Sequence, residues 1–387
     1  MRLPLHRATA LAIVALAALG TRAQAQGTLS TQGFGYPNGQ LSTRALGTGG
    51  ALGESDPYSA TNPAALFNFG GASVLYFQAE PEYRKLSVGG QTESATIARY
   101  PLVAAGVPVG TRFYLGLSAS SLLDRSFQTT VRASQVVSGQ TIGSTNTFTS
   151  DGAIGDVRLA LAFAPTNWLH LGAAGHVITG DNRLNSTQRF DDTTRYAALV
   201  DTQTVTYTGT AYSAGFDLAA GSLFTVSGSY RYGGPLSLKR ADTTLRNGHV
   251  PDRVSIGAAF VGLRGTTIGV RTSKDSWSNM APLALNTQRI TDAWDSSVGA
   301  DVLGPRLLGT QLLLRAGGRT RTLPFGTPGL TSASDVKETS FSFGAGGALA
   351  RGRAAFDVTG IHATRSAENT PAREQAWTLS VGVSVRP

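Results

Sequence analysis

The sequence predicts an all-β fold, a 14-stranded antiparallel transmembrane β-barrel. Apolar and polar residues alternate along most of the chain, and short Gly/Pro turns exchange with long polar segments. After residue 25 no apolar run approaches the length of about 18 residues that a membrane-spanning helix needs. Composition agrees, because 15% of the 387 residues are charged and 47 are glycine, whereas soluble domains carry about 25% charged residues and about 7% glycine.

Residues 1–25 have the pattern of a secretory signal peptide. Arg2 and Arg7 precede the apolar run 8–20, and Ala23-Gln24-Ala25 has the small-x-small pattern that signal peptidase cleaves. The apolar run is shorter than the roughly 20 residues of a spanning helix. We therefore expect export, which makes nucleic acid an unexpected partner. The positive charge of the chain, +9 overall, is then expected to face lipid phosphates or an anionic ligand.

Residues 26–70 do not alternate and are not expected to form a strand of the wall. Glycines at positions 47, 49, 50 and 53 allow tight backbone turns, and Asn62-Pro63 can cap and start a short helix. One interpretation is a plug inside the barrel, whose backbone polar groups bond to a polar lumen. The other is a disordered Gly-rich linker after the signal peptide.

From residue 71 onward the period of two predicts strands. Trp377, Leu379, Val381, Val383 and Val385 alternate with small or polar residues, which is typical of a strand with two different faces. The same pattern predicts fourteen strands, with the approximate bounds 72–86, 93–107, 111–127, 149–164, 168–182, 203–219, 223–238, 251–262, 266–276, 292–303, 308–322, 335–349, 353–364 and 374–385.

Six short turns separate these strands in pairs, and long polar loops join the pairs. The turns are 108–110, 164–167, 220–222, 263–265, 304–306 and 350–352. Short turns at one end and long loops at the other are typical of outer-membrane barrels. A soluble β-sandwich also alternates, but strands of about 12 to 17 residues are long for that class. Aromatic residues near strand ends are expected to form interfacial girdles: Trp168, Phe224, Trp294, Phe341 and Trp377.

Charged residues and histidines fall on the parity opposite to the large apolar residues, which predicts that they face the lumen. They are Arg112, Asp156, Arg158, His170, His176, Asp217, Arg231, Arg253, Arg271, Asp295, Asp301, Arg315, Arg319, Arg321 and Asp357. Charge on the lipid face would cost about 2 to 4 kcal/mol for Arg or Lys near the midplane. The charges either pair across strands and fill space, or Arg315, Arg319 and Arg321 attract the head group of an anionic ligand.

The N-terminal motif also carries a resemblance. Arg44-Ala45-Leu46-Gly47, then Gly49-Gly50-Ala51, Asp56 and Asn62-Pro63-Ala64-Ala65-Leu66 lead into a long first strand. This arrangement resembles the N-terminal hatch of FadL-type outer-membrane transporters of long-chain fatty acids and other hydrophobic compounds. Segments 250–257, 319–325 and 337–342 are similar to later strands of that family.

The resemblance implies a signal peptide at 1–25, a hatch at 26–70 and a barrel at 71–387. It implies that the ligand binds beside the hatch, which moves near residues 62–64, and leaves sideways through a break in the third strand. Ser118 to Asp124 is the candidate position of that break. The C-terminus departs from the family, because it ends in Val385-Arg386-Pro387 rather than an aromatic residue. The candidate ligand contacts are Arg44, Asn62, Pro63, Ala64, Arg315, Arg319 and Arg321.

Catalytic and metal chemistry is not expected. The chain has no cysteine, and no Gly-x-Ser-x-Gly or His-Glu-x-x-His motif occurs. His170 and His176 share the predicted lumen face but are about 20 Å apart along a strand. We therefore expect neither an enzyme nor a bound cofactor or metal ion.

The leading hypothesis is a monomeric outer-membrane channel for long-chain fatty acids or other hydrophobic or amphipathic small molecules. Apolar burial at about 25 cal/mol per Å² is expected to dominate binding. Outer-membrane lipid and lipopolysaccharide are the expected surroundings. Two alternatives stay open: a non-transporting accessory barrel that serves protein secretion or surface attachment, and a general diffusion porin.

Overall fold

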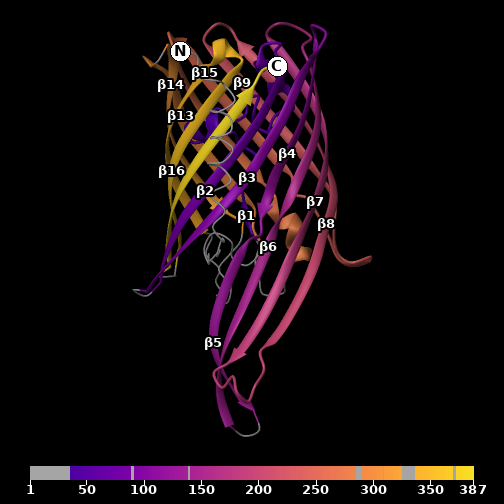
Figure 1. The fold of residues 1–387 in the computed structure, drawn as a ribbon. Coiled ribbons are helices and arrows are strands. Elements are labelled where there is room, and N and C mark those ends of the chain that lie inside the picture. Colours follow the sequence, from indigo (N-terminus) through magenta and orange to yellow (C-terminus); the bar gives the residue numbers. More distant parts are fainter. Residues whose placement is uncertain are drawn as a thin grey trace, which may run out of the picture.

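The computed structural model is an antiparallel β-barrel (Figure 1). It describes residues 35–88, 91–137, 140–284, 290–307, 309–324, 336–368 and 372–387. The predicted signal peptide and the first residues of the predicted hatch lie outside the described residues. Within the described parts no helix is long and apolar enough to cross a membrane.

Fourteen strands of the described residues form the wall, and β17 pairs with β2 to close it. Each predicted strand matches one of them, so the predicted fold is confirmed. They are β2 (Val74–Val88), β3 (Gln91–Val109), β4 (Phe113–Asp124), β6 (Gln140–Phe163), β7 (Leu169–Phe190), β8 (Leu199–Ala220), β9 (Phe224–Arg240), β11 (Arg253–Leu263), β12 (Thr266–Asp275), β13 (Ala293–Leu307), β14 (Thr310–Leu323), β15 (Val336–Leu349), β16 (Ala354–Ala367) and β17 (Arg373–Val385).

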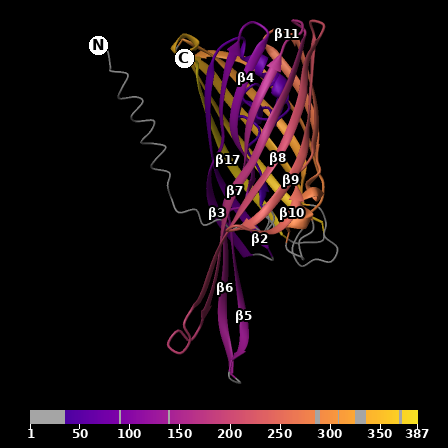
Figure 2. The ribbon, with the colours of Figure 1, turned by 90° about the vertical axis from the view of Figure 1, so that its right-hand side faces the viewer.

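Three further described strands lie beside the wall. β5 (Phe127–Val137) pairs with the first half of β6, β10 (Thr243–His249) pairs with β9, and β1 (Tyr36–Pro37) pairs with β4. The predicted third strand, 111–127, is thus wrong at its end, because β4 ends at Asp124. Parts of the predicted polar loops are also strands, since β6, β7 and β8 continue beyond the barrel as an exposed sheet with β5 (Figures 1 and 2).

The two faces of the wall have opposite chemistry. Large apolar side chains such as Leu117, Leu159 and Phe343 point outward and are exposed. The predicted lumen charges are buried or half-buried, because they face inward. Arg112 is the exception: it lies in the exposed turn before β4. The five predicted girdle aromatics are all about half exposed or more, as residues that face lipid head groups would be.

Residues 35–71, here called the N-terminal segment, lie inside the cylinder in both views (Figures 1 and 2). The segment contains β1, α2 (Thr43–Gly47) and the 3-10 helix η1 (Pro63–Phe69). Further 3-10 helices are η2 (Trp277–Leu283), in the loop before β13, and η3 (Ala350–Gly352), in the turn before β16. Beneath η2 a buried apolar cluster, which includes Leu122, Ile178 and Leu236, fills the loop end of the lumen.

Candidate functional site

The motif Asn62-Pro63-Ala64 docks the N-terminal segment onto the wall. Asn62 Nδ2 donates to the carbonyl oxygens of Glu54 and Phe216, and both distances are 2.9 Å. Its Oδ1 accepts from the backbone N–H of Ala64 at 3.0 Å. Asn62 thereby caps η1, and Pro63 occupies the first helical position, where no backbone N–H is needed. The cap that Asn62-Pro63 predicts is therefore present, and it is buried.

Two glycines of the wall let this motif approach. A Cβ atom at Gly215 would lie 2.1 Å from Asn62 Oδ1, and one at Gly172 would lie 2.4 Å from the backbone nitrogen of Ala64. Real Cβ atoms essentially never come so close. The absence of a side chain at these positions of β7 and β8 therefore shapes the seat of the segment.

At the opposite side of the segment, α2 lies against an arginine-aspartate group. Arg315 Nε donates to Asp301 at 3.1 Å and its Nη1 donates to Asp357 at 2.5 Å. Arg44 lies 3.6 Å from the same Asp301 carboxylate. Arg44 and Arg315 thus share an acidic partner, and the buried guanidinium of Arg315 is paired between strands rather than left open to a ligand.

The wall is interrupted between β3 and β4. Their ladder runs from Val109 and Phe113 to Leu102 and Ser120 and ends there. Among the described residues, the remainder of β3 pairs with β2 alone. The interruption begins at Pro101, which has no N–H to donate to a ladder. β4 is irregular at the same level, where its register with β6 shifts between Ser121 and Leu123.

This gap lies within the candidate segment Ser118 to Asp124, and the N-terminal segment fills it. In β1, Tyr36 pairs with Asp124 and Pro37 pairs with Leu123. Gly39, at a φ of 93°, sits so close that a Cβ there would lie 2.9 Å from both Pro101 Cβ and the Ser121 carbonyl oxygen. The ion pair from Arg99 Nε on β3 to Asp124 on β4, at 2.5 Å, bridges the same gap.

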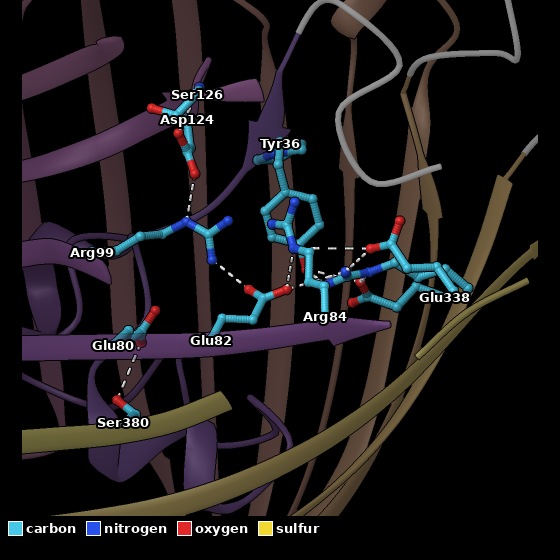
Figure 3. A network of polar contacts seen from close by, with 12 residues as sticks. Tyr36, Glu80, Glu82, Arg84, Arg99, Asp124, Ser126, Glu338 and Ser380 are labelled. Atoms are coloured by element: carbon cyan, nitrogen blue, oxygen red, sulfur yellow. Dashed lines mark hydrogen bonds and ion pairs between the residues drawn. The ribbon is translucent and has the colours of Figure 1, made fainter. Parts of the chain in front are cut away.

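Tyr36 lies in a group of charged side chains that we call the Tyr36 cluster. It comprises Tyr36, Glu82, Arg84, Arg99, Arg321, Glu338, Arg365 and Glu374. The Tyr36 hydroxyl donates to Glu338 Oε2 and accepts from Arg365 Nη2, and both distances are 2.8 Å. Arg321 also donates to this hydroxyl. Figure 3 shows the ring between Arg99, Arg84 and Glu338.

The Tyr36 cluster borders a cavity with about 1140 Å³ of empty space, part of it continuous with solvent. Toward the loops its lining is apolar and includes Leu122, Trp277 and Ala293, which also belong to the apolar cluster beneath η2. Eleven other lining residues are charged, and they stand among further polar and apolar ones: Glu80, Glu82, Arg99, Arg231, Arg253, Asp275, Asp295, Arg319, Arg321, Glu338 and Arg365. The cavity is therefore amphipathic.

The candidate arginines of β14 differ in their surroundings. Arg319 holds Asp295 with two hydrogen bonds, 2.8 and 2.7 Å long. Arg321 donates to Glu338 at 2.7 Å. Both line the cavity, whereas Arg315 does not. The structure thus brings Arg319 and Arg321 together at the cavity, joins Arg315 to Arg44, and places the Asn62 motif on a different part of the wall.

Asp156, His176 and Ser213 form a hydrogen-bonded chain across β6, β7 and β8. His176 Nδ1 lies 2.8 Å from Asp156 Oδ1, and its Nε2 lies 2.8 Å from Ser213 Oγ. The order of groups is that of a catalytic triad. Ser213, however, is paired on both sides within the sheet, so the surrounding backbone N–H groups bond to strands and offer no oxyanion hole. Sequence reasoning compared His176 with His170 alone, rejected that pair and missed this contact, which only strand register reveals.

No group of three or more His, Cys, Asp or Glu side chains within the described ranges is arranged to hold a metal ion.

Comparison with solved structures identifies the fold. A crystal structure of a Pseudomonas aeruginosa FadL homologue matches with a TM-score of 0.63 at 12% identity, covering 91% of this chain and 99% of that chain. The CymD monoaromatic hydrocarbon channel matches with a TM-score of 0.55 at 13% identity, covering 94% and 99%. The P. putida toluene transporter TodX matches with a TM-score of 0.56 at 12% identity, covering 90% and 97%. No family model and no curated protein sequence matches this chain. The chain therefore has the fold of the FadL-type channels.

Proposed function

We propose that the protein is an outer-membrane channel for hydrophobic and amphipathic small molecules. Compounds enter at the loop end, bind in the cavity beside the N-terminal segment and leave sideways through the gap between β3 and β4. The observation that carries this proposal is the interrupted wall, whose gap is filled by β1 of the N-terminal segment rather than by a strand of the barrel wall. The shared fold supports it, because the similar proteins are named as a toluene transporter and a hydrocarbon channel.

The surface of the barrel supports a membrane location. Its outward apolar residues would be costly to leave in water, and its inward charges would be costly to place in lipid. Exposed aromatic residues such as Trp168 and Trp377 lie near opposite ends of the wall strands, where interfacial girdles belong.

Residues 26–70 are proposed to act as the plug. In its described part Thr43 bonds to Ser380 of β17 at 2.8 Å, Gly49 to Ser342 of β15 at 2.9 Å, and Asn62 to β8. A segment tied to several sides of the lumen leaves no wide aqueous channel, which opposes a general diffusion porin. Release of β1 would break its two-residue pairing with β4 and the hydrogen bonds of the Tyr36 hydroxyl. It would leave the contacts of Thr43, Gly49 and Asn62 in place, so it would open the gap at less cost than unseating the whole segment.

A disulfide across the gap tests the exit path. The chain contains no cysteine, so P37C/L123C introduces a single pair, at residues that lie opposite each other in β1 and β4. Uptake of radiolabelled oleate and toluene is measured in a strain that lacks other channels of this fold. We expect the oxidised variant to lose uptake and the reduced variant to regain it, because the disulfide holds β1 in the gap.

The matched control is T272C/S296C, a cross-strand pair in the uninterrupted wall between β12 and β13, where the two hydroxyls are 3.0 Å apart. Its uptake is expected not to change on oxidation. Equal uptake by the oxidised and reduced gap variants would refute the lateral exit. A wild-type barrel that takes up neither compound would refute transport and favour the accessory barrel.

A further inference from the structure

The arginines around Tyr36 are held in place by the wall. Arg84, Arg99, Arg321 and Arg365 come from β2, β3, β14 and β16, and their guanidinium carbons lie 5.3, 5.4, 4.9 and 4.6 Å from the centre of the Tyr36 ring. Such placement favours an aromatic ring, because its faces carry partial negative charge. Four cations from four strands thus surround one ring.

Carboxylates of the wall, and not Tyr36, fix these cations. Arg365 Nε donates to Glu338 at 2.5 Å and its Nη1 to Glu82 at 3.1 Å, while Arg84 Nε donates to Glu82 at 2.6 Å. Arg99 is held by Asp124. Because each cation has an acidic partner on the wall, the arrangement is preorganised and does not depend on the ring that now occupies it.

The occupant belongs to a different part of the chain. Tyr36 sits on a two-residue strand at the edge of the N-terminal segment, and Tyr36, Arg99, Arg321 and Arg365 all line the cavity. A small aromatic molecule in the cavity therefore lies beside Arg99, Arg321 and Arg365. It reaches the position among all four guanidinium groups where it displaces the buried Tyr36 ring. The side chain of tyrosine is itself a phenol with an alkyl group in the para position.

We propose that this arrangement is a recognition site for 4-alkylphenols, with Tyr36 as a built-in competitor. The ring of the ligand lies among the four guanidinium groups, and its hydroxyl donates to Glu338 and accepts from Arg365 and Arg321. The proposal rests on the function proposed above and specifies one class of compound for its cavity. A displaced Tyr36 would also loosen β1 from the gap, so binding would favour opening.

The hydroxyl decides the specificity. A hydrocarbon of the same shape would leave the buried Glu338 and Arg365 groups without the hydrogen bonds that they make to Tyr36. The loss of these two hydrogen bonds to buried, charged groups is expected to weaken binding about 100-fold. The site should therefore discriminate strongly between 4-ethylphenol and ethylbenzene.

Equilibrium binding of these two probes to the purified full chain in detergent tests the proposal. In Y36A the competitor is absent, so we expect 4-ethylphenol to bind at least about 10-fold more tightly than to the wild type. The same variant is expected to prefer 4-ethylphenol over ethylbenzene about 100-fold. Y36A/E338Q keeps a side chain of the same shape at position 338 but removes the charged acceptor, which also holds Arg321 and Arg365, and it should lose most of that preference.

Y58A is the matched control, because Tyr58 is also a buried tyrosine of the N-terminal segment but packs against Phe69 and Tyr76. It should gain no preference for the phenol. Heat-modifiable migration in gel electrophoresis establishes that each variant is a folded barrel. Equal binding of the two probes by Y36A, or an equal gain in Y58A, would overturn the proposal. The disulfide experiment reads out transport separately, so the site and the channel can fail independently.

Discussion

Replacing Asn62 by alanine should release the N-terminal segment from its seat. The side chain makes three hydrogen bonds and is buried. Loss of a helix cap costs about 0.5 to 2 kcal/mol, and each further buried group left without its partner costs about 1 kcal/mol or more. The seated state should lose about 2 to 4 kcal/mol in total, which shifts the equilibrium toward unseated states roughly 30-fold to several hundred-fold.

Two measurements read this shift. Single-channel recordings in planar bilayers should show openings at least about 30 times as often in N62A as in the wild type. Backbone amides of the segment that bond locally, such as that of Gly50 to Ala45 at 2.8 Å, should exchange hydrogen correspondingly faster. N247A, which removes an exposed asparagine from β10, is the control and should change neither. Wild-type recordings and wild-type exchange in N62A would refute the idea that Asn62 holds the seat.

Three further predictions concern the seat, the plug and a loop. G215A adds a methyl group 2.1 Å from the present position of Asn62 Oδ1. It should therefore raise the frequency of channel openings as N62A does. An opening frequency equal to that of the wild type would contradict the close approach. Deletion of residues 27–66 should unplug the barrel and raise single-channel conductance, whereas unchanged conductance would count against a plug. Burial raises the pKa of Asp292, but hydrogen bonds from Ser278 and Lys274 outweigh it and hold the pKa below its usual value of 3.8. The ionised Asp292 carboxylate should therefore stabilise the loop before β13 above about pH 4, and this stabilisation should be lost as the pH falls further. Acrylamide quenching of the buried Trp277 should then rise on acidification in the wild type. S278A should make the quenching depend less on pH.

The cavity changes the expected chemistry of the ligand. The cavity has an apolar side beneath η2 and a charged side at the Tyr36 cluster. It therefore favours molecules with one apolar part and one polar group. Many of the buried charges here are paired with an oppositely charged group on a neighbouring strand, as Arg319 is with Asp295. Removal of one partner would leave the other unpaired at high cost.

Sequence reasoning placed the candidate residues on the correct face but not in the correct groups. Arg315, Arg319 and Arg321 share one strand and one parity, and pattern alone cannot separate them. In the structure Arg315 pairs with Asp301 and Asp357, whereas Arg319 and Arg321 line the cavity. The difference depends on which strands lie beside β14 and at what register, and no local pattern encodes that.

The wall gap had a signal that sequence reasoning did not use. The candidate segment 118–124 contains neither proline nor glycine, but the ladder ends beside Pro101, on the neighbouring strand. A missing N–H interrupts both strands of a pair, so the residue responsible for an irregular strand can lie on its partner.

The number of strands, their two faces and the order of turns and loops were decided by the sequence itself, because a side chain alternates sides with every residue and each turn is local. Tertiary structure alone decided which residues meet inside. Tyr36 bonds to Glu338 across 302 positions of the chain, and that contact exists because β17 closes on β2 and brings both ends of the sequence to one cavity. Closure and register belong to the whole barrel, so the Tyr36 cluster and the pairing of β1 in the gap form only when the cylinder is complete.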